Sequence, residues 1–143
     1  MKLLLAFSLV VVLIIAGCNN SPVMKQSSLR EDQDSKGFIE VGGTKLNYVV
    51  EGKGISCLVI GSSIYYPRTF DKKLRDHFKF CFVDMRWFAK DYTTVKPENF
   101  TLKTILEDIE KVRSELKLGK VIIIGHSIHG TIAFEYARRY WNG

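Results

Sequence analysis

The sequence has few of the residues that build metal centres and disulfide frameworks. Its 143 residues include only three cysteines and three histidines, and no two cysteines are separated by just two residues. This spacing excludes the common zinc-binding patterns, so we expect no metal site and no cofactor. Cys57 and Cys81 each lie in an apolar run, which predicts small buried side chains; a disulfide is the alternative if the protein is exported.

Charge of one sign is not concentrated anywhere along the chain. Lysine and arginine number 21 against 15 aspartate and glutamate, which gives a net charge of +6, but the two signs alternate. The sequence has no basic cluster with interleaved aromatic side chains, which nucleic-acid-binding surfaces commonly show. We therefore expect no nucleic-acid partner, and we interpret the excess as solvated surface with some affinity for anionic lipid headgroups.

The long hydrophobic run of this sequence lies at its start. Residues 3–15 are almost all apolar, follow Lys2 and precede Ala16–Gly17–Cys18. The run is too short to span a bilayer comfortably and is typical of a secretory signal. Its end resembles a bacterial lipobox, which implies cleavage before Cys18 and lipid attachment to that cysteine. An uncleaved anchor is the alternative. Both interpretations hold the protein at a membrane, and the lipobox predicts an extracytoplasmic bacterial lipoprotein.

Composition divides the chain into parts and predicts an α/β fold. Residues 1–17 are the expected signal peptide, 18–36 a polar tether, and 37–143 the folded body. The expected strands of that body are 38–41, 45–51, 56–60, 78–83 and 120–124, and its expected helices are 67–77, 102–116 and 131–140. Hairpin strands followed by alternating strands and helices indicate a mainly parallel sheet with flanking helices.

The most informative segment is Gly125–His126–Ser127–Ile128–His129–Gly130, between the last expected strand and the last expected helix. A serine on a sharp strand-to-helix turn with small neighbours is typical of a nucleophile elbow. The turn lifts the Ser127 hydroxyl above the sheet edge and aims the first helical amides at an oxyanion formed there. The alternative is a serine that merely tolerates a tight turn.

Further signatures accompany this segment in order. Ile60–Gly61–Ser62–Ser63 follows the third expected strand, and Asp84–Met85–Arg86 follows the fourth. Together with the serine turn they resemble the α/β-hydrolase superfamily over residues 37–141, and more loosely its proline-iminopeptidase and esterase branch. The resemblance implies a serine hydrolase that cleaves an ester or amide bond in a small molecule or peptide.

The resemblance also implies residue roles. Ser127 would attack a carbonyl carbon, and the backbone amides of Ile128 and Ser62 would form the oxyanion hole. For Ser62, a loop cap is the alternative.

The sequence departs from the family pattern at several positions. Ile60 stands where the family often has histidine, Trp87 replaces a usual glycine, and His129 replaces the second glycine of the serine motif. We expect His126 and His129 to pack or to bond locally rather than to act as the general base, because both are fixed on the same turn as the nucleophile.

Little of the expected catalytic machinery follows the serine. In this family the triad acid and histidine come later in the chain, yet the only later histidine and carboxylate are His129 and Glu135. We therefore expect residues 1–143 to be the N-terminal half of a hydrolase, inactive alone, with 121–124 as an exposed sheet edge. The alternative is a non-catalytic, membrane-attached interaction module.

Overall fold

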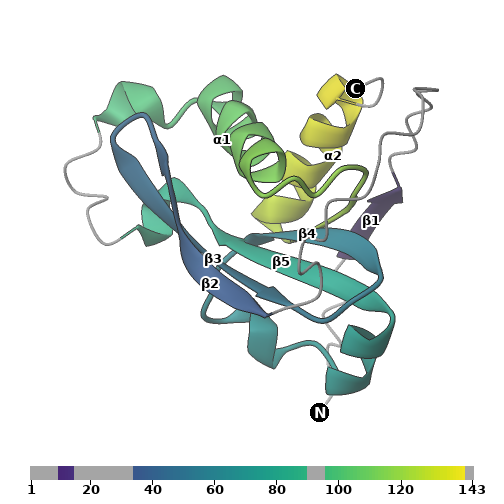
Figure 1. Ribbon diagram of the computed structural model, residues 1–143. Coiled ribbons are helices and arrows are strands. Elements are labelled where there is room, and N and C mark those ends of the chain that lie inside the picture. Colours follow the sequence, from purple (N-terminus) through teal and green to yellow (C-terminus); the bar gives the residue numbers. More distant parts are fainter. Residues whose placement is uncertain (1–9, 15–33, 90–95, 141–143) are drawn as a thin grey trace, which may run out of the picture.

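The computed structural model describes residues 10–14, 34–89 and 96–140. Its elements are the strands β1 (Val10–Ile14), β2 (Ser35–Val41), β3 (Thr44–Glu51), β4 (Ile55–Gly61), β5 (Phe78–Asp84) and β6 (Ile122–His126), and the helices α1 (Leu102–Glu115) and α2 (Ile128–Tyr140). The strands form one sheet in the order β1-β6-β4-β5-β3-β2, with α1 and α2 on one face (Figure 1). The predicted α/β class is confirmed.

The centre of the sheet is parallel and its periphery antiparallel. β4 pairs in parallel with both β5 and β6. Strands buried on both faces form continuous apolar runs, as in Leu58, Val59 and Ile60, each at most 2% exposed. β2 and β3 form the predicted hairpin, closed by Gly42 and Gly43 with φ of 53° and 79°. Positive φ at both positions is the geometry of the favoured hairpin turn.

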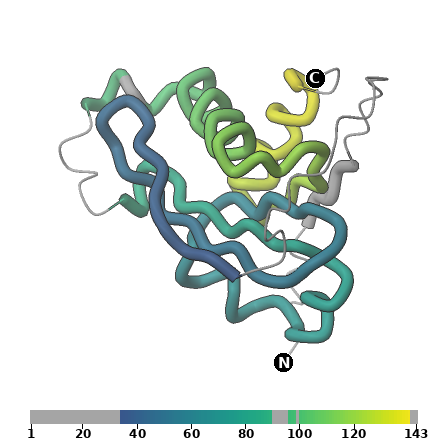
Figure 2. The backbone as a smooth tube through the Cα atoms, viewed as in Figure 1, coloured from purple at the N-terminus to yellow at the C-terminus, as the bar shows by residue number. Residues whose placement is uncertain are grey.

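Apolar side chains pack on both faces of the sheet. The larger cluster lies between the sheet and the two helices, where Ile109, Val112 and Ala133 are at most 1% exposed. A smaller cluster on the opposite face comprises Cys57, Val59, Phe80 and Phe82, with Tyr66 and Phe70 packed against it. The backbone trace in Figure 2 shows α1 and α2 on one side of the sheet and the segment that carries Tyr66 and Phe70 on the other.

The two cysteines of the body are buried, as predicted, and both thiols are free. Burial raises the pKa of Cys57 to about 11 and that of Cys81 to about 12. Both side chains therefore stay protonated at neutral pH, and the disulfide alternative is wrong.

Helix α1 begins as the sequence predicts. The Thr101 hydroxyl accepts a hydrogen bond from the amide of Thr104 at 3.2 Å, which caps the helix. Its buried residues are Ile105, Leu106, Asp108, Ile109 and Val112. Leu102, expected on this face, is 46% exposed at the first helical position. A charged residue, Asp108, takes a buried place because an arginine pairs with it, as described below.

One predicted helix is wrong. The segment 67–77 forms two 3-10 helices, Tyr66–Arg68 and Lys72–Asp76, instead of one α-helix. The Thr69 hydroxyl donates to a backbone carbonyl three residues earlier at 2.9 Å, and the Asp71 carboxylate accepts from an amide two residues later at 2.8 Å. Such local side-chain bonds compete with the hydrogen bonds of an α-helix.

The edge of β6 is covered, contrary to the prediction that it is exposed. β1, which lies within the expected signal peptide, pairs antiparallel with β6 over its whole length. The expectation of a free edge over 121–124 is therefore wrong for a chain that keeps its leader, because an apolar extended segment satisfies the edge's backbone groups. Residues 1–9 and 15–33, with Cys18 and most of the tether, lie outside the described residues. Within the described part, neither helix has the length and apolarity to cross a membrane.

Candidate active site

The carboxyl ends of β4, β5 and β6 meet at one edge of the sheet. β4 and β5 end side by side, and Val59 of β4 pairs with Ile124 of β6. Ser62 directly follows the end of β4, and Ser127 directly follows the end of β6. The segments singled out in the sequence therefore lie together, although they are far apart along the chain.

Ser127 has a left-handed backbone, with a φ of 57°, between the end of β6 and the start of α2. This conformation costs a residue with a side chain on the order of 1–2 kcal/mol, so the surrounding contacts must hold it. The amide of Gly130 donates to the Ser127 carbonyl at 2.9 Å. At Gly125, a Cβ atom would lie 2.1 Å from the carbonyl oxygen of His129. Only glycine lets strand and helix approach so closely here. Residues 125–130 are called the Ser127 turn below.

Two backbone amides beside this turn take no part in the hydrogen bonds of the helices and strands. Ile128 is the first residue of α2, where N–H groups have no intrahelical partner. Among the described residues, none accepts a hydrogen bond from the Ser62 amide. The Ser62 hydroxyl accepts from the amides of Ile64 and Tyr65 at 3.3 and 3.2 Å, so the side chain caps its own loop. The loop cap that the sequence suggested as the alternative role of Ser62 is therefore present. It uses only the hydroxyl, so the Ser62 amide remains available to a ligand.

Asp84 holds the loop that carries Ser62. Its carboxylate is buried, accepts from the amide of Ser63 at 2.6 Å, and accepts from the side-chain amide of Asn47 at 2.9 Å. Hydrogen bonds to a buried carboxylate are stronger than those between neutral groups. Asp84 therefore fixes residues 61–65, called the Ser62 loop below, to the end of β5.

A buried ion pair anchors the neighbouring segment. The Arg86 guanidinium makes a two-pronged contact with the Asp108 carboxylate of α1, with one of the two bonds at 2.8 Å. Arg86 also donates to the carbonyl of Val41 at 3.4 Å. Burial raises the pKa of Asp108, against the opposing effect of the Arg86 charge. The pair joins the hairpin, the segment after β5 and α1, and gives the Asp84–Met85–Arg86 signature a structural role.

His129 is a buried residue of the Ser127 turn, 8% exposed. Its ring stacks on the indole of Trp87, with centroids 5.7 Å apart and an interplanar angle of 14°. Its Nδ1 lies 3.4 Å from the Tyr66 hydroxyl, and its buried Nε2 has no partner among the described residues. Burial lowers the pKa of His129, opposed by the backbone carbonyl of His126. The imidazole is therefore neutral at pH 7.

The other candidate groups lie in different surroundings. His77 is exposed and follows the second 3-10 helix. Glu135 accepts a hydrogen bond from Arg138 one turn later in α2, at 2.8 Å. Among the described residues, no group of histidine, cysteine and carboxylate side chains could hold a metal ion.

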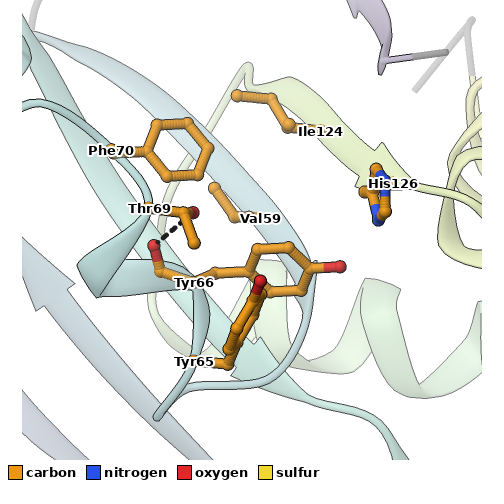
Figure 3. Close-up of a pocket in the computed structure, with 8 residues that line it drawn as sticks. Val59, Tyr65, Tyr66, Thr69, Phe70, Ile124 and His126 are labelled. Carbon is orange, nitrogen blue, oxygen red and sulfur yellow. Dashed lines mark hydrogen bonds between the residues drawn. The ribbon is translucent and has the colours of Figure 1, made fainter. Parts of the chain in front are cut away.

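A cavity of about 430 Å³ opens beside the Ser127 turn. Its lining includes Val59, Tyr66, Phe70 and Ile124, which belong to the smaller apolar cluster on the sheet face opposite α1 and α2. Figure 3 shows Tyr65, Tyr66 and Phe70 on one side of it and Ile124 and His126 on the other. Its lining is predominantly apolar and aromatic, which is typical of sites for small organic ligands.

Comparison with known proteins identifies the family. The sequence pattern described as "alpha/beta hydrolase fold" matches residues 57–142. The chain belongs to the α/β-hydrolase family. It is 43% identical over 104 residues to the AB hydrolase superfamily protein YclE of Bacillus subtilis, which covers 73% of this chain. The match spans only 37% of the length of that α/β-hydrolase.

Solved structures agree on the fold. A proline iminopeptidase-related protein from Thermus thermophilus is similar with a TM-score of 0.63 and 22% identity, over 76% of this chain and 41% of its own. An epoxide hydrolase from Vigna radiata is similar with a TM-score of 0.62 and 18% identity, over 76% and 37%. At these identities the likeness concerns the α/β-hydrolase fold and not the substrate.

Several contacts of the site were not predicted from the sequence. The bond from Ser63 to Asp84 and the contacts of His129 with Tyr66 and Trp87 join segments that are distant in the chain. One signal was present, because Trp87 and His129 both replace glycines of the family pattern. Two replacements of glycine by a large side chain suggest that the two side chains, Trp87 and His129, pack against each other.

Proposed function

We propose that this α/β-hydrolase is a serine hydrolase that cleaves an ester or amide bond in a small molecule or peptide, with Ser127 as its nucleophile. The observation that carries the proposal is the left-handed backbone of Ser127 at the end of β6, with a φ of 57°. Strain of this kind in a residue that is not glycine persists where the surroundings enforce it, and it concentrates at functional sites. The strand–turn–helix context is that of a nucleophile elbow.

The chemistry follows from the groups around Ser127. The hydroxyl oxygen bonds to the substrate carbonyl carbon while a base removes its proton, and the carbonyl oxygen becomes an oxyanion. The amides of Ile128 and Ser62 donate to this oxyanion. The carbon–oxygen or carbon–nitrogen bond then breaks, and the alcohol or amine leaves with a proton. Water hydrolyses the resulting serine ester, which releases the acid and restores the hydroxyl.

The base and the acid of the reaction are proposed to come from outside the described residues. His129 is buried against Tyr66 and Trp87, and Glu135 is engaged by Arg138. A serine without a base is a weak nucleophile. We therefore expect residues 1–143 alone to show no turnover.

The full-length gene product provides the test of this function. Ser127→Ala should lower hydrolysis of p-nitrophenyl esters or of amino-acid p-nitroanilides by at least about a thousandfold. Ser114→Ala, an exposed serine of α1, is the matched control and should behave as wild type. Turnover by Ser127→Ala within about tenfold of wild type would identify another nucleophile. No turnover by any variant, with Ser127 unreactive, would favour the non-catalytic module.

We further propose that the protein is a lipoprotein held at an extracytoplasmic membrane through Cys18. The apolar run of residues 3–15 and the Ala16–Gly17–Cys18 sequence support this. Stable anchoring requires more than one acyl chain, as bacterial lipid modification of a cysteine supplies. Cleavage before Cys18 would remove β1 and open the edge of β6. Radiolabelled fatty acid should enter the wild-type protein but not Cys18→Ala, and labelling of that variant would show that the interpretation is wrong.

A further inference from the structure

The two positions at which large side chains replace glycines of the family pattern contact each other. Trp87 comes from the segment after β5, and His129 from the first turn of α2. Their rings are nearly parallel, with an interplanar angle of 14°. The exposed ring of Phe88 lies 6.2 Å from the same imidazole. One face of His129 is therefore fixed by the segment after β5.

Tyr66 contacts the imidazole from a different direction. Its ring is edge-on to His129, with an interplanar angle of 84°, and its hydroxyl lies 3.4 Å from Nδ1. The Tyr66 amide also donates to the carbonyl of Ser62 at 3.3 Å. Tyr66 therefore links His129 to the Ser62 loop through this backbone hydrogen bond.

Gly61 shows how closely these groups are packed. A Cβ atom at Gly61 would lie 2.3 Å from Cε2 of Tyr66 and 3.2 Å from Nδ1 of His129. The side chains of Tyr66 and His129 thus fill the space that Gly61, the residue before Ser62, leaves open. Both side chains therefore lie next to the backbone that leads into Ser62.

His129 is itself a buried part of the Ser127 turn. It lies one residue after Ile128, and its carbonyl oxygen occupies the space where Gly125 lacks a side chain. Through its ring, His129 contacts Tyr66, whose amide is bonded to the Ser62 carbonyl. Through its backbone, it packs against Gly125 in the Ser127 turn.

We propose that His129 is a positioning residue, which sets the separation between the Ser62 and Ile128 amides through its contacts with Tyr66 and Trp87. This inference rests on the proposed hydrolase function, in which those amides stabilise the oxyanion. A shift of about 1 Å in such a site is enough to lower the rate about a hundredfold. His129 acts through other groups and does not exchange protons with the substrate, because its Nε2 is buried and its Nδ1 faces Tyr66.

The first experiment needs no substrate. The Ser63 amide is hydrogen-bonded to Asp84, so its hydrogen exchange reports opening of the Ser62 loop. In the full-length gene product, Tyr66→Phe and His129→Gly should accelerate exchange at Ser63. His77→Gly, at an exposed histidine, is the matched control and should not. Unchanged exchange in both site variants would overturn the proposal whether or not the protein is a hydrolase.

The second experiment measures ester hydrolysis in the same variants. Removing an interaction that is made only in the transition state lowers kcat and leaves KM unchanged. His129→Gly should therefore lower kcat about tenfold or more with KM within about twofold. Tyr66→Phe, which removes only a hydroxyl, should lower kcat without a change in melting temperature. A rise in KM at constant kcat would overturn the positioning role.

A double variant tests the stack with Trp87. Residues in contact show non-additive effects. The loss of kcat in Trp87→Gly/His129→Gly, which restores both glycines of the family pattern, should be smaller than the product of the single losses. An additive result would show that Trp87 does not act through His129. Turnover that survives Ser127→Ala would instead reject the proposed function, and the exchange result at Ser63 would stand by itself.

Discussion

The carboxylate of Asp84, at the end of β5, accepts a hydrogen bond of 2.6 Å from the backbone amide of Ser63, on the loop after β4. This bond ties two neighbouring strand ends together at the edge where Ser127 lies. It also uses the Ser63 amide, so that the neighbouring Ser62 amide is the one left for a ligand. A signature that the sequence showed only as a resemblance thus has a defined structural task.

Removing the charge of Asp84 should loosen this edge. Asp84→Asn keeps the shape but weakens the bonds from Ser63 and Asn47, and it should lower the free energy of unfolding by about 1.5–3 kcal/mol. Denaturant unfolding measures this change. Asp71→Asn is the control, because the Asp71 carboxylate also accepts from a backbone amide but is exposed. An equal effect of the two substitutions would contradict the role of Asp84.

The strain at Ser127 predicts that a glycine at this position gives a more stable protein than an alanine. Ser127→Gly relieves the left-handed conformation and Ser127→Ala retains it, so the glycine variant should be more stable by about 1 kcal/mol. Both variants lack the hydroxyl, which removes any difference in chemistry. Thermal or denaturant unfolding compares them directly. A less stable glycine variant would show that the backbone of Ser127 is not strained.

Burial of His129 predicts a dependence of stability on pH. Its pKa is lowered in the folded protein, so the unfolded chain binds more protons at acid pH. The contribution of His129 is complete above the unfolded pKa of about 6.5 and is lost as the pH falls below it. In His129→Phe this part of the pH dependence should disappear. Curves of unfolding free energy against pH that are parallel for the two proteins would contradict the prediction.

The buried ion pair of Arg86 and Asp108 predicts that breaking it lowers the free energy of unfolding much more than breaking an exposed pair. Asp108→Asn leaves the guanidinium buried without its counter-charge and should lower the free energy of unfolding by about 3–5 kcal/mol. Glu115→Gln breaks an exposed pair with Lys111, in which the charged atoms are 3.6 Å apart, and serves as the control. Denaturant unfolding should show at most about 1 kcal/mol for the control. Similar losses in the two variants would mean that the buried pair is not specially important.

Much of the fold could be predicted because short sequence patterns indicate its strands, turns and helix ends. The apolar run through Val59 predicted a buried strand, Gly42–Gly43 predicted the hairpin, and Thr101 predicted the start of α1. Each depends on residues close together in the chain. The tight turn around Ser127 was predictable for the same reason.

The remaining features depend on contacts between distant segments. Thr69 and Asp71 bond to nearby backbone groups and interrupt the expected helix, and their rotamers could not be known from the sequence. The pairing of β1 with β6 was missed because an apolar leader has the composition of a signal peptide whatever it pairs with. The contact between Tyr66 and His129 required the ends of β4 and β6 to be placed side by side.

Covalent labelling of Ser127 in the full-length gene product tests the central claim most directly. A fluorophosphonate probe reacts with serines that are activated as nucleophiles, and mass spectrometry of the digested protein locates the modified residue. The proposed function predicts modification at Ser127, no labelling of Ser127→Ala, and wild-type labelling of the Ser114→Ala control. Modification at a different residue, or equal labelling of Ser127→Ala and wild type, would contradict it.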